Sequence, residues 1–293
     1  ELLEIAIEKN INFLFEASCG GGIPIIRPLN SSLTADEIDE ITGILNGTTN
    51  YILTKMSKEG LEFDDVLKDA QEKGYAERNP GADVEGYDAC RKIAILSSLA
   101  FGNNVDFEEI YTEGITKITA QDILYANEMH MAVKLLASSR KVNDQFYAMV
   151  APFLMDDSHP LYSVNGVFNA IFVHGNVLGD AMFYGSGAGK LPTASAVVAD
   201  VVDAVKHLNR TVMTFWSSRK LSLSSIENAE RRFFLRIPVA KLSEAQALFP
   251  GSEVVRVAEL PEECALVSDQ MSEKAFEEKA QKLGGVISRI RLV

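Results

Sequence analysis

The first part of the chain shows two hydrophobic patterns in succession. Apolar side chains recur at helical spacing through residues 1–10, which predicts a short amphipathic helix. Apolar and polar residues then alternate through residues 11–18, which predicts a strand. A helix followed by a strand, with no initiator methionine and no earlier strand, is typical of the last piece of an α/β unit. We therefore expect the chain to be a fragment that lacks the earlier pieces.

The following segment predicts helices. The capping-box pattern of Thr34 and Glu37 predicts a helix start, and the apolar face behind it extends to Asn46. A break or bend over residues 46–49 precedes a second helical stretch that runs to Met56. This part of the chain is therefore expected to be helical on both sides of a turn.

Beyond it, the pattern changes from helices to strands. Residues 63–73 predict a helix that Gly74 stops, residues 75–84 a polar loop, and residues 85–100 a further helix. Between residues 132 and 183 the apolar positions alternate in four segments. These segments are AVKLLASS, QFYAMVAPFLM, VFNAIFVHG and VLGDAMFYG. We expect an open antiparallel or mixed sheet packed on helices.

The C-terminal part predicts a second unit. A Gly-rich turn at 185–189 and Pro192 indicate the start of an apolar helix, and residues 211–231 resemble a connector. The remaining residues, 230–293, have the order strand, helix, strand, strand, helix, strand of a ferredoxin-like βαββαβ domain. The fold class expected is α/β, with an α+β central domain.

Composition excludes several classes of protein. The 293 residues carry 28 Lys and Arg against 41 Asp and Glu, and the net charge of −13 opposes binding to nucleic acid. No apolar run approaches the roughly 20 residues that cross a membrane, and the acidic start is unlike a secretory signal. Three scattered cysteines argue against a disulfide framework. We expect a cytoplasmic protein without nucleic-acid or membrane partners.

The most informative polar residues lie between Tyr75 and Lys92. Asp88 and Lys92 are four residues apart on a predicted helix, so they share a face and can exchange a proton or hold a common ligand. Glu77 and Asp83 lie on the preceding loop, which can fold back over the first turns of that helix. A solvated, salt-bridged helix face would show the same Asp–Lys spacing.

Four longer segments together resemble the homoserine dehydrogenase family, in that family's order and at its approximate spacings. They are FEASCGGGIPIIRPL, GILNGTTNYILTKM, GYAERNPGADVEGYDACRKIAIL and GSGAGKLPTASAVVADVVD. The resemblance covers residues 1 to about 210. It implies the reversible reduction of L-aspartate 4-semialdehyde to L-homoserine with NAD or NADP, a step toward threonine, methionine and isoleucine.

The resemblance also implies roles for individual residues. Lys92 corresponds to the catalytic lysine that transfers a proton at the substrate oxygen, and Asp83 to an acidic residue that supports it. Glu77 corresponds to the carboxylate that holds the substrate's ammonium group. The other implied substrate-binding residues are Asp88, Gly47, Thr48 and Tyr75.

Two further sites are implied by the same resemblance. Gly74 and Gly189 correspond to positions approached by the cofactor, although a simple tight turn would also explain the glycines around Gly189. A monovalent cation, Na⁺ or K⁺, would be ringed by backbone carbonyls, and the alternative is a tight turn with an empty centre. The residues implied for this cation site are Glu16, Cys19, Gly21 and Ile23.

The implied domains divide the chain into five parts. These are the end of a nucleotide-binding domain (1–22), a substrate, catalytic and dimerisation domain (23–188), a helix returning to the first domain (189–210), a connector (211–229) and an ACT-like domain (230–293). The Gly-rich dinucleotide fingerprint and a second catalytic lysine would precede the chain, so we expect this chain alone to be inactive. We also expect apolar faces without a partner on the first and the returning helix (Leu2, Leu3, Ile7; Val197, Val201, Val205).

The C-terminal segment raises the question of partners. ACT domains bind amino acids in many biosynthetic enzymes, but this segment lacks the Asp-x-Pro-Gly turn usual after their first strand. An amino-acid effector and pairing with another subunit both stay open, and we expect a homodimer or a higher homo-oligomer. The alternative function is a non-catalytic amino-acid sensor or assembly protein on the same scaffold.

Overall fold

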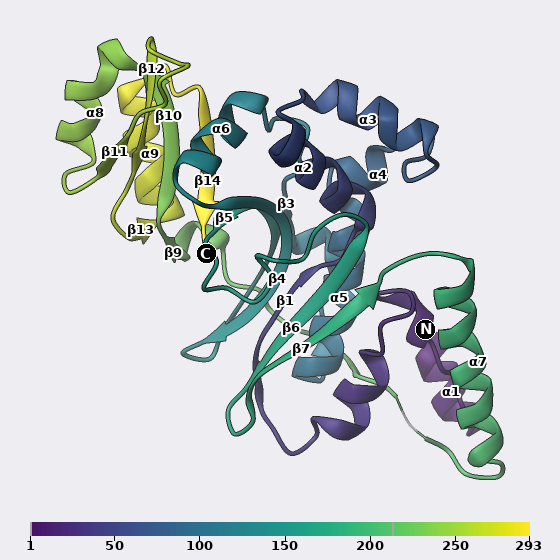
Figure 1. Ribbon diagram of the computed structural model, residues 1–293. Coiled ribbons are helices and arrows are strands. Elements are labelled where there is room, and N and C mark those ends of the chain that lie inside the picture. Colours follow the sequence, from purple (N-terminus) through teal and green to yellow (C-terminus); the bar gives the residue numbers. More distant parts are fainter. Residues whose placement is uncertain (1, 213) are drawn as a thin grey trace.

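The computed structural model describes residues 2–212 and 214–293, and its centre is one mixed sheet (Figure 1). Among the described residues this sheet has ten strands, in the order β11-β12-β10-β14-β5-β4-β1-β6-β7 with β3 pairing with β5. They are β1 (Ile38–Ile44), β3 (Tyr111–Thr112), β4 (Ala132–Val142), β5 (Gln145–Met155), β6 (Phe168–Gly175), β7 (Gly179–Ser186), β10 (Phe233–Pro238), β11 (Glu253–Val255), β12 (Glu263–Val267) and β14 (Ser288–Leu292). Two small ladders pair β2 (Asn103–Asn104) with β8 (Ser217–Lys220), and β9 (Glu230–Arg231) with β13 (Met271–Ser272).

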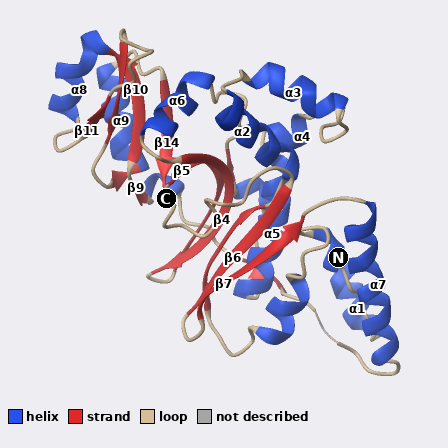
Figure 2. Cartoon of the chain, viewed as in Figure 1, coloured by secondary structure: helices blue, strands red, loops and turns tan. Residues whose placement is uncertain are grey.

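Helices cover one face of the middle of this sheet, where α2, α5 and α6 contact β4 and enclose the main core (Figure 2). The helices are α1 (Leu2–Lys9), α2 (Gly47–Glu59), α3 (Phe63–Glu72), α4 (Gly81–Val84), α5 (Tyr87–Phe101), α6 (Ala120–Glu128), α7 (Lys190–Lys206), α8 (Leu242–Leu248) and α9 (Glu273–Leu283). Short 3₁₀ turns are η1 (Glu16–Ser18), η3 (Phe107–Glu109), η4 (Ile226–Asn228) and η5 (Val239–Lys241), and η2 (Pro28–Ser32) is a π-helical turn. On the opposite face of the sheet, Leu161 and Val164 from the loop after β5 join a second, smaller core.

Most of the predicted elements are confirmed. The helices expected over residues 63–73 and 85–100 are α3 and α5, and the apolar helix after the Gly-rich turn is α7. The four expected strands are β4 to β7. In the loop expected over residues 75–84, the last four residues form the short helix α4.

The helix predicted after Thr34 is wrong, because residues 38–44 form the strand β1. This strand lies between β4 and β6 and hydrogen-bonds to both. Ile41 belongs to the main core and Ile44 to the second core, as the alternation of side chains along a strand requires. Pairing on both edges and burial on both faces outweigh the local helix-start pattern. The Thr34 hydroxyl donates instead to the Ser31 carbonyl at 3.3 Å.

The strand predicted over residues 11–18 is also wrong. Residues 11–15 are irregular, and Glu16–Ser18 form the turn η1. A strand needs a hydrogen-bonding neighbour, and none of the described strands pairs with this segment. The Asn12 side chain instead binds the backbone of residues 210 and 212, at 3.0 and 2.7 Å.

The C-terminal unit has the predicted βαββαβ order, in β10, α8, β11, β12, α9 and β14. Its last strand, β14, is also hydrogen-bonded in parallel to β5, with Arg291 beside Phe153 and Leu292 beside Leu154. The sheet of the unit, yellow to light green in Figure 1, is therefore continuous with the central sheet.

Buried ion pairs add to this connection. Arg291 makes two hydrogen bonds to the Glu273 carboxylate, at the start of α9, and a third to Glu113, which follows β3, at 2.8 Å. The side chains of Arg291 and Glu273 are only 2% and 6% exposed. Arg289 also reaches Glu113, at 3.2 Å. The C-terminal unit is thus attached to the central sheet by buried ion pairs as well as by strand pairing.

Lys134 of β4 is a buried lysine without a carboxylate partner among the described residues. Its side chain is 2% exposed. The ammonium donates to the Val164 carbonyl at 2.5 Å and to side-chain oxygens of Asn165 and Asn50 at 3.0 and 3.4 Å. Burial, with a smaller contribution from the charge of Lys58, lowers the pKa of Lys134 to about 8. The charged form is therefore less favourable in the folded protein than in water.

This pKa predicts how stability depends on pH. An unfolded lysine titrates near pH 10.4, so the unfolded state binds more protons than the folded state between the two pKa values. The contribution of Lys134 should therefore increase the free energy of unfolding as the pH rises from about 8 toward about 10.4. Urea unfolding of wild type and Lys134→Met across this range measures the effect. The same pH dependence in both proteins would show that Lys134 is not the group responsible.

The helix α7 carries exposed apolar side chains, as expected. Val197, Val201 and Val205 are exposed, and so are Leu2 and Ile7 of α1, whereas Leu3 is half-buried. No helix in the described part of the chain is long and apolar enough to cross a membrane.

Candidate functional site

Asp88 and Lys92 lie on one face of α5 and form an ion pair. Lys92 Nζ is 2.7 Å from Asp88 Oδ2 and donates at 2.9 Å to the carbonyl oxygen of Leu45, just after β1. Both side chains are partly exposed. A lysine ammonium has three N–H groups, and these two partners hold it in one place. The structure therefore brings the predicted pair together and leaves the ammonium one donor for a ligand.

Asn46 connects this pair to Asp83. Its Nδ2 donates to Asp83 Oδ1 at 2.7 Å and to Asp88 Oδ2 at 2.9 Å, while its Oδ1 accepts from the Thr49 N–H and caps α2. The sequence predicts a break or bend at this position but no role for Asn46 in a site. A signal was present, because asparagine directly before a helix is a favoured cap. The partners of its NH₂ group depend on the tertiary fold and could not be found that way.

The cluster carries more negative than positive charge. Asp83 and Asp88 share the neighbourhood of one ammonium, and Glu77 is close enough to affect the titration of Asp83. Burial raises the pKa of Asp83, and the charges of Asp88 and Glu77 raise it further, against the opposing effects of the Asn46 hydrogen bond and Lys92. Such a surplus of carboxylates favours a cationic group on a ligand.

The loop after α3 contacts the start of α2. The Thr48 hydroxyl donates to the Tyr75 carbonyl at 2.6 Å, and the Tyr75 ring lies 4.8 Å from that of Tyr51. Glu77 is exposed, and its backbone carbonyl accepts from the Gln71 side chain at 3.0 Å. The structure thus places Thr48 and Tyr75 together and leaves the Glu77 carboxylate accessible.

Glu16 uses its carboxylate inside the fold. It accepts backbone N–H bonds from Ile25, Ile26 and Arg27, at 2.5, 2.8 and 2.8 Å, and so caps the helical turn that leads into η2. Cys19 is buried, and its Sγ lies 3.7 Å from the Lys92 carbonyl. Burial raises the pKa of the Cys19 thiol to about 12, so it stays protonated at neutral pH. Because both side chains are engaged within the fold, Glu16 and Cys19 could bind a cation only through their backbone carbonyl oxygens.

The glycine turn packs against the loop before α7. Gly21 has φ +58°, and a Cβ on it would overlap the carbonyl group of Gly187. The Gly22 N–H donates to the Ser186 carbonyl at 3.1 Å. No group of three or more His, Cys, Asp or Glu side chains in the described part of the chain is placed to hold a metal ion. The predicted cation turn therefore contacts the loop of Gly189.

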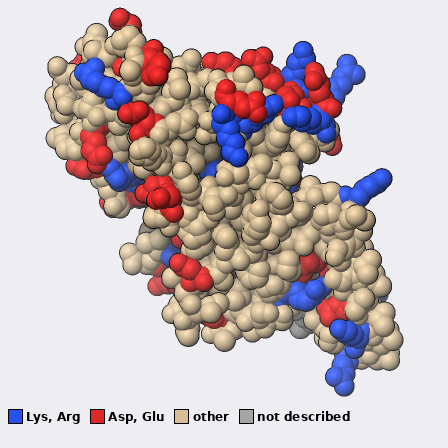
Figure 3. Space-filling view, in the orientation of Figure 1, with Lys and Arg blue, Asp and Glu red and all other residues tan. Residues whose placement is uncertain are grey.

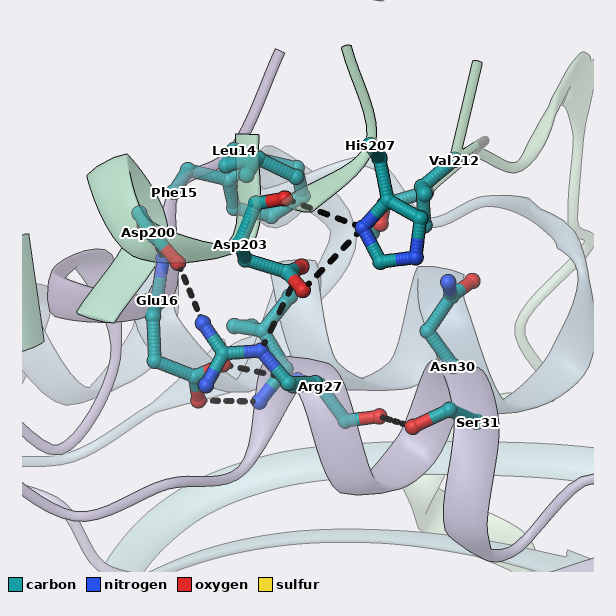
Figure 4. A pocket seen from close by; sticks show the side chains of 12 residues that line it. Leu14, Phe15, Glu16, Arg27, Asn30, Ser31, Asp200, Asp203, His207 and Val212 are labelled. Atoms are coloured by element: carbon teal, nitrogen blue, oxygen red, sulfur yellow. Dashed lines mark hydrogen bonds and ion pairs between the residues drawn. The ribbon is translucent and has the colours of Figure 1, made fainter. Parts of the chain in front are cut away.

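A cavity of about 260 Å³ lies between α7 and the segment around η2 (Figure 4). Arg27 reaches Asp200 at 2.7 Å and Asp203 at 3.7 Å, and Asp203 also lies 3.3 Å from Nδ1 of His207. Asp200 accepts the backbone N–H of Glu16 at 2.9 Å, which ties α7 to the predicted cation turn. Asp83, Asp88 and Lys92 do not line this cavity, so it is separate from their cluster.

Comparisons with known sequences all find similarity to homoserine dehydrogenases. A family model described as homoserine dehydrogenase matches residues 24–202. The homoserine dehydrogenase of Synechocystis sp. is 45% identical over 248 residues, which are 80% of this chain and 57% of that protein. The enzyme of the same name from Bacillus subtilis is 39% identical over 299 residues, covering 97% of this chain and 69% of that protein. This chain thus spans little more than half the length of the Synechocystis relative.

Solved structures agree with the sequences and confirm the α/β fold. The crystal structure of a homoserine dehydrogenase from Thiobacillus denitrificans matches with a TM-score of 0.88 at 35% identity, over 100% of this chain and 72% of that one. A hyperthermophilic archaeal homoserine dehydrogenase in complex with NADPH matches with a TM-score of 0.61 at 33% identity, over 70% of this chain and 59% of that one.

Proposed function

The chain belongs to the homoserine dehydrogenase family, and from this premise we propose that its full-length gene product catalyses the reversible, NAD(P)-dependent reduction of L-aspartate 4-semialdehyde to L-homoserine. One observation carries the proposal. It is the network of Asp83, Asn46, Asp88 and Lys92, which holds one ammonium group among carboxylates.

The network and its neighbours provide partners for both the ammonium group and the reacting oxygen of the substrate. The carboxylate of Glu77 binds the substrate's ammonium group and Asp88 is a second polar anchor for the substrate. Gly47, Thr48 and Tyr75 line the pocket around it. Lys92, held by Asp88 and by the Leu45 carbonyl, donates a proton to the substrate oxygen during reduction and accepts it in the reverse reaction. Asp83 supports Asp88 through Asn46. A bound nicotinamide cofactor supplies the hydride.

The cation would be held on the glycine turn, and the cofactor by the loop before α7 together with the turn after α3. We assign Gly189, at the start of α7, and Gly74, after α3, to the cofactor, because neither presents a side chain that would obstruct its approach. The backbone carbonyls of Glu16, Cys19, Gly21 and Ile23 are assigned to a Na⁺ or K⁺ ion. The support is that the side chains of Glu16 and Cys19 are engaged within the fold and that Gly21 allows the close contact with Gly187.

A spectrophotometric assay tests the function. The purified full-length gene product is mixed with L-homoserine and either NADP⁺ or NAD⁺, and the absorbance of the reduced cofactor is followed. We expect reduction that depends on homoserine with at least one of the two. No reduction with either would favour the non-catalytic sensor or assembly protein.

Glu77→Gln should chiefly raise the KM for homoserine. A neutral amide loses the charge-assisted bond to the ammonium group, which is worth about 1.5–3 kcal/mol, or about 10- to 150-fold in affinity. Steady-state kinetics of the full-length protein measure the change. Glu72→Gln, on the exposed end of α3, is the matched control, and an unchanged KM in Glu77→Gln would remove this residue from the substrate site.

The domain assignments are proposals as well. Residues 1–22 and 189–210 belong to a nucleotide-binding domain, residues 23–188 form the substrate domain, 211–229 the connector and 230–293 an ACT-like domain. The exposed valines of α7 and the βαββαβ order of the last part support these boundaries. The ACT-like domain is the place for an amino-acid effector, and the three buried free cysteines support a cytoplasmic location.

A homodimer through β6 and β7 is expected. Phe168, Met182 and Tyr184 are exposed on these strands, and Figure 3 shows few charged side chains on this face, while they gather over α2, α3 and the C-terminal unit. Two-fold pairing would remove this apolar surface from water. Sedimentation at micromolar concentration should show a dimer, and Met182→Lys should weaken it. A wild-type monomer would contradict the proposal.

A further inference from the structure

Asn169 is a buried asparagine outside the residues assigned so far. It is the second residue of β6, where the next residue, Ala170, pairs with Ile44 at the end of β1. Its side chain is 1% exposed. It therefore lies at the end of β1 from which the chain continues into Leu45, Asn46 and the start of α2.

The carboxamide of Asn169 lies between two glycines. A Cβ on Gly187 would overlap this carboxamide. A Cβ on Gly47 would come within 3.4 Å of Asn169 Oδ1 and within 2.8 Å of the Val167 carbonyl oxygen. The Asn169 side chain thus occupies the space that a side chain at Gly187 would need, and its Oδ1 lies at van der Waals distance from the position of a Cβ on Gly47. Gly47 begins the turn assigned to the substrate, and Gly187 lies in the loop assigned to the cofactor.

The oxygen of this carboxamide is unusual. Asn169 Oδ1 is buried and has no hydrogen-bond partner within the described ranges. Nearly all buried polar atoms are hydrogen-bonded, because losing water without a replacement is unfavourable. An apolar residue of similar size would avoid this loss, so packing alone does not account for an asparagine here.

We propose that Asn169 is a positioning residue, which sets the spacing between the Gly47 turn and the Gly187 loop and so between substrate and cofactor. This inference rests on the proposed function. The side chain touches no reacting atom and acts through the two loops. A misplacement of about 1 Å can cost about 100-fold in rate, so a change at this side chain affects turnover more than binding of either ligand.

Asn169→Ala, Gly187→Ala and the double variant test the contact in the full-length gene product. Gly187→Ala alone should destabilise the fold and weaken NADP⁺ binding, because its methyl group meets the carboxamide. In the Asn169→Ala background, Gly187→Ala should change the NADP⁺ Kd by no more than about twofold. It should change the free energy of unfolding by no more than corresponds to a twofold change in the folding equilibrium, which is about the usual scatter between independent substitutions. Equal effects of Gly187→Ala in both backgrounds would overturn the contact.

Kinetics test the positioning role. Asn169→Ala should lower kcat by about 100-fold and leave the KM for homoserine nearly unchanged. Asn228→Ala, at the exposed end of η4, is the control that should keep kcat. If the kcat of Asn169→Ala per folded molecule is unchanged, or if only its KM is raised, the positioning role is overturned. Activity of the wild-type protein in the same assay would still uphold the proposed function. Absence of wild-type homoserine oxidation would reject the proposed function and this role together, and calorimetric NADP⁺ titration would still report the contact.

Discussion

A Lys92→Ala variant of the full-length gene product is expected to lose about 100- to 10,000-fold in kcat for homoserine oxidation, the usual contribution of general acid–base catalysis. The physical reason is the position of the ammonium. Asp88 and the Leu45 carbonyl fix it at 2.7 and 2.9 Å, and alanine has no group that could donate a proton from this position.

The neighbouring residue supplies a matched control. Arg91 is also on α5, but it is exposed and its guanidinium lies over the ring of Phe107. Arg91→Ala should keep kcat, and the NADP⁺ Kd measured by calorimetry should stay near the wild-type value in both variants. Near-normal turnover of Lys92→Ala would remove this lysine from the mechanism.

Arg291→Met is expected to have the largest effect on stability, a loss of about 3–5 kcal/mol in the free energy of unfolding. Arg291 and Glu273 are almost completely buried, and Arg291 also binds Glu113. Replacing the guanidinium by an apolar side chain leaves these two carboxylates in a poorly solvated place with only Arg289, at 3.2 Å from Glu113 and 3.6 Å from Glu273, as a counter-charge. Urea unfolding monitored by circular dichroism measures the loss.

Two further variants separate charge from packing in this cluster. Arg232→Met removes a partly exposed pair with Glu253 and should cost less than about 1 kcal/mol. Combining Arg291→Met with Glu273→Leu removes one buried carboxylate, so the double variant should be more stable than Arg291→Met alone. If the double variant is no more stable, the loss comes from the packing of the arginine rather than from the unpaired charge.

Sequence patterns predicted secondary structure best for elements with one apolar face, because the spacing of the apolar residues then shows whether the element is a helix or a strand. The helices α3, α5 and α7 and the strands β4 to β7 were predicted because apolar periodicity and glycine or proline stops agree there. The segment of β1 has a helix-start pattern, but its hydrogen bonds come from β4 and β6, which lie far away in the sequence. Local patterns carry no information about such partners.

The same distinction applies to the site. Asp88 and Lys92 could be paired from the sequence because four residues on one helix fix their geometry. Asn46 and Asn169 were missed, because their partners are brought to them by the sheet and by loops up to tens of residues away. Family resemblance supplied the other residues, such as Glu77, whose side chain has no geometric signature of its own.

The most direct test of the account is a crystal structure of the full-length gene product with L-homoserine and NADP⁺. We expect the hydroxyl group of homoserine to lie about 3 Å from Lys92 Nζ, within hydrogen-bond distance, and its ammonium group to contact the carboxylate of Glu77. Homoserine bound with its hydroxyl away from Lys92, or in a different part of the molecule, would contradict it.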